Sequence, residues 1–123
     1  PPGLVSRPAA PLDQDVTTLI LHNLDHRSSS PNLRAALDAV GFANTYDFLY
    51  VPMSKNGKTA AGVAFVNFVT SQVADEFRTR AKSMAISRRG GRLRVTTAKI
   101  QGREENDAKV RESGGYAWLA PCD

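Results

Sequence analysis

An eight-residue run at positions 61–68, AGVAFVNF, constrains the fold of this 123-residue chain more than any other segment. It is rich in β-branched and aromatic residues, as strands are, and successive side chains of a strand point to opposite faces of the sheet. We expect Ala64, Val66 and Phe68 to face a buried core. The other face would carry Ala61, Val63, Phe65 and Asn67. The run therefore predicts a strand that is buried on one side and open to solvent on the other.

Three more segments have the composition of strands. Residues 17–22 and 46–51 are rich in β-branched, aliphatic and aromatic side chains. Residues 93–96 follow a turn signal of two arginines and two glycines at 88–91. With residues 61–68, these segments make four expected strands.

Two amphipathic helices are expected between these strands. Ser30 followed by Pro31 marks the start of the first helix, and Gly41 marks its end. Thr70 or Ser71 caps the second. The apolar stripes that would pack on the sheet are Leu33, Leu37 and Val40 in the first helix and Val73, Ala74, Phe77 and Ala81 in the second.

The resulting order, strand, helix, strand, strand, helix, strand, predicts an α+β fold of the ferredoxin-like βαββαβ type. Four antiparallel strands bury one face under two helices and leave the other face open. This domain would occupy residues 17–100. Residues 1–16, with four of the seven prolines, are expected to be a disordered linker. Residues 101–123 would be a C-terminal extension with a short charged helix at 103–113.

The charge of the chain favours an acidic partner. It has 16 Lys and Arg against 12 Asp and Glu, a net charge of +4, and every charged residue from Arg78 to Arg103 is basic. A polyanion such as nucleic acid is the natural counterpart of such a block, and a solvated charged surface is the alternative. The lone Cys122 allows no internal disulfide, so we expect an intracellular location, nuclear or cytoplasmic. No apolar run approaches the about 20 residues that span a bilayer, so no membrane contact is expected.

The sequence does not favour an enzyme, a metal site or a cofactor. It contains no Gly-rich phosphate loop and no HExxH pattern. His22 and His26 have a spacing that places two metal ligands on one face only in a helix, whereas here residues 23–25 between them end a strand. Because the chain begins with Pro1 rather than Met, we expect a monomeric domain of a larger protein.

Two short motifs resemble those of a known family. Residues 61–68 match the octamer K/R-G-F/Y-G/A-F-V-x-F/Y at five of its seven specified positions, with Ala61 and Val63 as the departures. Residues 19–24, which begin 42 residues earlier, match the accompanying hexamer, with Ile20 at its aromatic position. The chain therefore resembles an RNA recognition motif (RRM), and this resemblance implies binding of single-stranded RNA in post-transcriptional regulation.

A narrower resemblance is to the C-terminal RRM of the meiosis-regulator (Mei-two-like) RNA-binding proteins. It rests on residues 17–24, 46–53 and 62–68, and more weakly on residues 100–102 before a charged helix. The chain differs from that family where Val63 replaces a usual tyrosine. It also lacks a tryptophan-containing stretch before the last strand.

The predicted RNA-binding residues lie on the open face and in the loops at its edges. Stacking on Phe65 is the expected main contact, and Tyr50 and Phe48 on the second strand would complete a displaced aromatic platform. The alternative is that Phe48 or Tyr50 packs at the sheet edge or under the C-terminal helix. The full predicted set is Phe65, Tyr50, Phe48, Ile20, His22, Val63, Asn67, Arg92, Arg94, Lys55 and Lys58.

A competing hypothesis is that the domain is a degenerate RRM that binds a protein partner. Ile20 and Val63, with Leu12 or Val110, would then form an apolar patch for that partner or for the chain's own tail. Tyr116 and Trp118 lie in this tail, and the sequence does not decide whether they dock on the sheet or on a partner.

Overall fold

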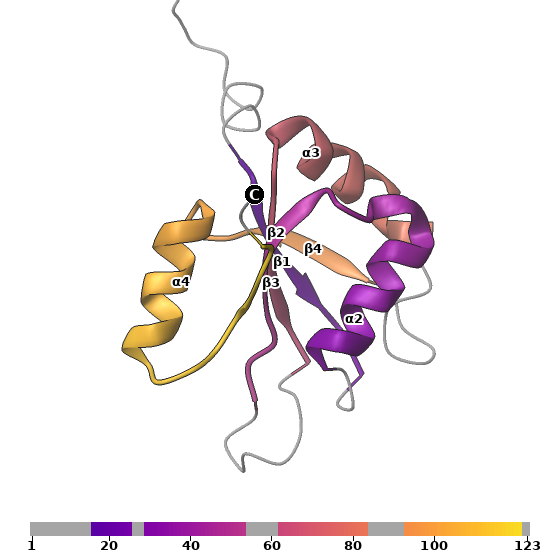
Figure 1. Cartoon of the computed structure of the whole chain (residues 1–123). Helices are drawn as coiled ribbons and strands as arrows, with labels where there is room; N and C mark the ends of the chain where they lie inside the picture. The colour runs from indigo at the N-terminus through magenta and orange to yellow at the C-terminus, as the bar shows by residue number, and fades with distance from the viewer. Residues whose placement is uncertain (1–15, 26–28, 54–61, 84–92, 122–123) are drawn as a thin grey trace, which may run out of the picture.

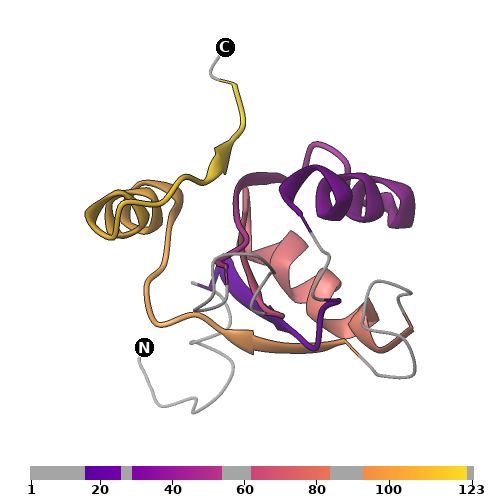
Figure 2. The same cartoon turned by 90° about the horizontal axis from the view of Figure 1, so that it is seen from below.

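The computed structural model describes residues 16–25, 29–53, 62–83 and 93–121. These residues form an α+β fold in which α2 and α3 cover one face of an antiparallel sheet and α4 lies over the other (Figures 1 and 2). The elements are β1 (Thr18–His22), α2 (Ser30–Leu37), the π-helical turn η1 (Asp38–Phe42), β2 (Tyr46–Tyr50), β3 (Ala64–Phe68), α3 (Ser71–Arg80), the 3-10 turn η2 (Ala81–Ser83), β4 (Arg94–Thr97), α4 (Arg103–Glu112) and β5 (Trp118–Leu119).

The sheet has the order β4-β1-β3-β2-β5, so β1 and β3 are central. The four strands and two helices expected from sequence are confirmed, and the charged C-terminal segment forms α4. The short strand β5, which pairs with the edge of β2, was not expected.

Local sequence signals account for the ends of the helices. The Ser29 side chain accepts a hydrogen bond from the backbone N–H of Asn32, so Ser29 caps α2 one residue before the predicted cap. Thr70 caps α3 in the same way, through the N–H of Val73. Gly41 ends the first helical segment with a φ of +103°, a conformation that favours glycine.

The main core lies between the sheet and helices α2 and α3. Phe42, Phe68 and Phe77 form its aromatic centre, with ring centroids 5.1 to 6.0 Å apart. Each of these rings is almost fully buried, which stabilises the fold by about 1.5–3 kcal/mol per side chain. The predicted inward residues Ala64, Val66 and Phe68 are confirmed as buried, and Leu19, Leu21 and Leu49 on the neighbouring strands are buried with them.

A β-bulge in β2 places Tyr46 and Phe48 on different sides of the sheet. The register shifts between these two residues, so Tyr46 opposes Phe68 while Phe48 opposes Asn67. Tyr46 joins the main core, where its hydroxyl donates a hydrogen bond to Asp38 at 2.8 Å. Burial, together with that carboxylate, raises the pKa of Tyr46 to about 12.

Candidate nucleic-acid interface

The face opposite α2 and α3 carries a row of apolar side chains across three neighbouring strands. Ile20 of β1 pairs with Phe65 of β3, which pairs with Tyr50 of β2. The Phe65 and Tyr50 ring centroids are 6.3 Å apart and their planes are tilted by 33°. All three side chains are partly exposed. The expected placement of Tyr50 beside Phe65 is therefore confirmed.

Helix α4 covers a neighbouring part of this face. Phe48 is fully buried, and Val110 and Asn106 of α4 are buried on the same side. The prediction that Phe48 is an exposed stacking residue is therefore wrong, and the alternative that it packs under the C-terminal helix is correct. The strand alternation placed Phe48 on the correct side but contained no information about what covers it.

Asn67 is also buried beneath the start of α4, so the expectation that it is accessible is wrong. Its Oδ1 accepts hydrogen bonds from the hydroxyls of Thr17 and Thr18, both at 2.7 Å. Its Nδ2 donates to Asp47 at 2.7 Å. Asn67 thus joins β1, β3 and β2 at one end of the sheet and has a structural role.

Gln101 holds α4 in place over the sheet. Its Oε1 accepts hydrogen bonds from the backbone N–H groups of Thr17 and Thr18, at 2.8 and 2.9 Å. Its Nε2 donates to the carbonyls of Thr18 and Ala98, at 2.9 and 2.8 Å. Gly102 follows with a φ of +100° and turns the chain into α4. The motif at residues 100–102 therefore forms the joint between the domain and its C-terminal helix.

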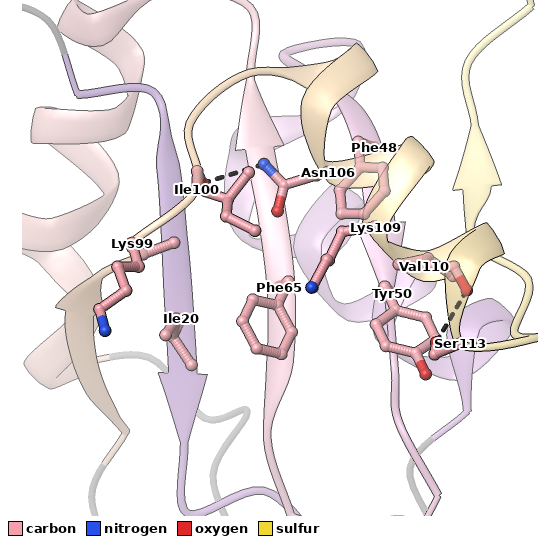
Figure 3. Close-up of a pocket in the computed structure, with 11 residues that line it drawn as sticks. Ile20, Phe48, Tyr50, Phe65, Lys99, Ile100, Asn106, Lys109, Val110 and Ser113 are labelled. Atoms are coloured by element: carbon pink, nitrogen blue, oxygen red, sulfur yellow. Dashed lines mark hydrogen bonds between the residues drawn. The ribbon is translucent and has the colours of Figure 1, made fainter.

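A cavity of about 300 Å³ lies between α4 and the apolar row (Figure 3). The row, Phe48 and Val110 line its apolar part. Asn106 and Lys109 of α4 add polar groups that the sequence did not identify as site residues. The sequence signal that identifies them is their position beside Val110, the one large aliphatic residue of that helix.

The far end of the open face is polar. His22 and Thr96 form a hydrogen bond of 2.8 Å between Nε2 and Oγ1. His22 is paired across the strands with Arg94, which is exposed. Burial, and then the charge of Arg94, lower the pKa of His22 from its ordinary value. Both effects favour the neutral imidazole ring.

Of the remaining predicted residues, only Val63 lies in the described part of the structure. Val63, immediately before β3, is partly exposed. Lys55, Lys58 and Arg92 lie outside the described residues. Lys99 is exposed and lines the cavity, which adds one cation that the sequence analysis did not single out.

The C-terminal tail docks on the chain's own sheet. Trp118 of β5 pairs with Leu49, and its ring lies 5.3 Å from that of Tyr46. The guanidinium group of Arg34 on α2 lies 4.1 Å from the centre of the Trp118 ring, within the range of a cation–π contact. The question that the sequence left open for Trp118 is thereby answered, whereas Tyr116 is 93% exposed.

Within the described residues, no cluster of three or more His, Cys, Asp or Glu side chains is arranged to hold a metal ion. None of the helices in that part of the chain is long and apolar enough to cross a membrane.

The family model for RNA recognition motif 2 matches residues 16–111, which include β1 to β4 and nearly all of α4. The chain belongs to the RNA recognition motif 2 family. Among curated relatives, this RRM is similar to Protein MEI2-like 4 of Oryza sativa subsp. japonica, with 37% identity over 60 residues, 49% of the chain and 6% of that protein. Protein MEI2-like 4 of Arabidopsis thaliana is 40% identical over 53 residues, 43% of the chain and 6% of that protein. The matched region is thus a small part of these relatives.

Solved structures show the same fold. The second RRM domain of yeast poly(U)-binding protein Pub1 superposes with a TM-score of 0.55 and 20% identity, covering 71% of this chain and 99% of the Pub1 chain. The Sxl-lethal protein in complex with RNA has a TM-score of 0.56 and 23% identity, covering 71% of this chain and 49% of the Sxl-lethal chain.

Proposed function

We propose that this RRM binds single-stranded RNA without catalysis, through the part of the sheet face that α4 leaves open, and that it acts in post-transcriptional regulation. The observation that carries the proposal is the row of Ile20, Phe65 and Tyr50 across three strands. The family and the solved RNA complex of a protein with this fold support it. An unpaired base has a flat face that stacks on such a row, and each stack contributes about 1–3 kcal/mol.

Cations surround this row. Arg94, Lys99 and Lys109 are exposed beside the row or the cavity. Their charges are available to RNA phosphates, and such contacts release counterions when they form. We therefore expect the affinity for RNA to fall as the salt concentration rises.

The competing hypothesis is an apolar patch that binds a protein partner, and one residue proposed for that patch is not accessible. Val110 is buried against the sheet and is not available to a partner together with Ile20 and Val63. Leu12 lies outside the described residues.

The test is a titration of the isotope-labelled protein with pooled short RNA oligonucleotides, monitored by amide NMR. We expect shifts at Ile20, Phe65 and Tyr50, and we expect Phe65→Ala to weaken binding about tenfold because one base stack is lost. Val69→Ala, which truncates an exposed apolar side chain beyond the end of β3, is the control and should bind normally. Shifts confined to α2 and α3, or none at millimolar RNA, would contradict the proposal.

A further inference from the structure

The cavity under α4 contains more than an apolar stacking surface. We propose that it is a subsite for one unpaired RNA base, which stacks on Phe65 and is held at its edge by Asn106 and Lys109 of α4. This inference rests on the proposed RNA binding and adds α4 to the binding site. The helix then forms one wall of the site and does not have to leave the sheet when RNA binds.

The shape and lining of the cavity suit a flat aromatic group. Its volume of about 300 Å³ is at the lower end of the range for small-molecule pockets. Ile20, Phe65 and Tyr50 form an apolar floor on the sheet, and Val110 lies on the α4 side. A base that lies on this floor turns its hydrogen-bonding edge toward the helix.

Asn106 presents a fixed acceptor to that edge. Its Nδ2 donates to the carbonyls of Gly102 and Ile100, at 2.7 and 3.0 Å, so the amide cannot turn without losing both bonds. The residue is only 6% exposed, and within the described residues its side-chain hydrogen bonds are all donated by Nδ2. In Figure 3 its Oδ1 points along the sheet toward Phe65. The oxygen of a residue that lines the cavity can accept a hydrogen bond from an amino or imino N–H of a base.

Lys109 supplies the complementary donor. Its side chain extends from α4 in front of the sheet, with the ammonium group directed toward Phe65 (Figure 3). Its ion pair with Glu112 is 3.7 Å long and exposed, so it restrains Lys109 weakly. The ammonium group is therefore available to a base carbonyl or ring nitrogen.

These polar groups favour a base over an apolar side chain of a protein partner. An inserted leucine or phenylalanine would fill the floor but would offer no hydrogen-bonding group to the Asn106 amide or the Lys109 ammonium. A base provides the apolar faces together with donors and acceptors at its edge. The site is also preformed, because Gln101 anchors α4 at one end and β5 anchors the following chain at the other, and preformed sites lose less entropy on binding.

The experiment compares two variants of α4 with the same loss of charge. Lys109→Met removes the cation that faces the cavity, and Arg111→Met removes an exposed cation that pairs with Asp107 and does not line the cavity. With pooled RNA oligonucleotides, we expect Lys109→Met to weaken binding about tenfold, the effect of one charge-assisted hydrogen bond. Arg111→Met should change it less than about twofold, as for an exposed pair. In the wild type, RNA should shift the side-chain amide signals of Asn106.

Hydrogen exchange shows whether α4 stays in place. The amides of Thr17 and Thr18 donate to Gln101, so their protection reports on the joint of α4. We expect them to stay protected in the RNA complex. Loss of this protection, equal effects of the two variants, or no response of Asn106 would overturn the inference while sensitivity to Phe65→Ala still supports RNA binding. If neither Phe65→Ala nor Lys109→Met affects binding, the proposed function itself fails.

Discussion

Phe65 and Asn67 point to the same side of β3, yet one is partly exposed and the other is buried in a hydrogen-bond network. The same contrast separates Tyr50 from Phe48 on β2. Alternation along a strand determines the side to which a residue points. It does not determine whether a distant segment covers that residue, and this is why Phe48 and Asn67 were assigned to the accessible surface.

The pH response of His22 is a test at the scale of one residue. Burial and Arg94 lower its pKa, so the folded state disfavours the protonated ring. The unfolded chain takes up a proton as the pH falls through about 6.5, and the folded chain does so only at lower pH. The stabilisation of the fold by the neutral His22 ring is thus fully present above about pH 6.5. It is lost as the pH falls through the lower pKa that His22 has in the folded state.

We expect an NMR titration of the His22 ring to give a pKa below the ordinary histidine value, and Arg94→Ala to move it upward. Thr97→Ala, which truncates an exposed side chain on the same strand, serves as the control and should leave the titration unchanged. A His22 ring that titrates at or above the ordinary value would contradict the environment described for it.

At the scale of elements, the strands and helices follow from local patterns, whereas the position of α4 does not. The stripes of α2 and α3 and the cap at Thr70 were recognisable in the sequence. Helix α4 buries little apolar surface, chiefly Val110, and depends on the hydrogen bonds of Gln101 with Thr17 and Thr18. These bonds join residues 83 and 84 positions apart in the chain.

Gln101→Ala should therefore loosen α4. It leaves the backbone N–H groups of Thr17 and Thr18 without their acceptor, which we expect to lower the free energy of unfolding by about 2 kcal/mol. Urea unfolding measures this change, and faster exchange of the Thr17 and Thr18 amides should accompany it. Gln72→Ala, the same substitution at an exposed position of α3, should have little effect. Equal stability of the two variants would show that Gln101 does not anchor the helix.

At the scale of the whole molecule, the C-terminal segment wraps around the β2 edge of the sheet. Helix α4 lies on one face, and β5 then pairs with β2 and places Trp118 against Tyr46 and Arg34 at the edge of the main core. The continuous segment of residues 103–119 thus lies over part of one face and then runs along the β2 edge, while α2 and α3 cover the other face (Figure 2).

Trp118→Ala should destabilise the whole domain. The lost packing of this partly buried ring should lower the free energy of unfolding by about 2 kcal/mol, about half the cost for a fully buried tryptophan. Thermal or urea unfolding measures the change. Tyr116→Ala, which removes a 93% exposed ring from the same tail, should leave stability unchanged. If Trp118→Ala were equally neutral, the tail would not contribute to the fold.

The sequence by itself determined the βαββαβ order, the inward residues of β3 and the outward placement of Phe65 and Tyr50, because these depend on periodicities within short segments. Only the tertiary structure decided which outward residues remain accessible, that Trp118 docks in cis, and that Asn106 and Lys109 line the cavity. These outcomes depend on contacts between residues up to 88 positions apart, such as Thr18 with Asn106, and no local pattern encodes such contacts.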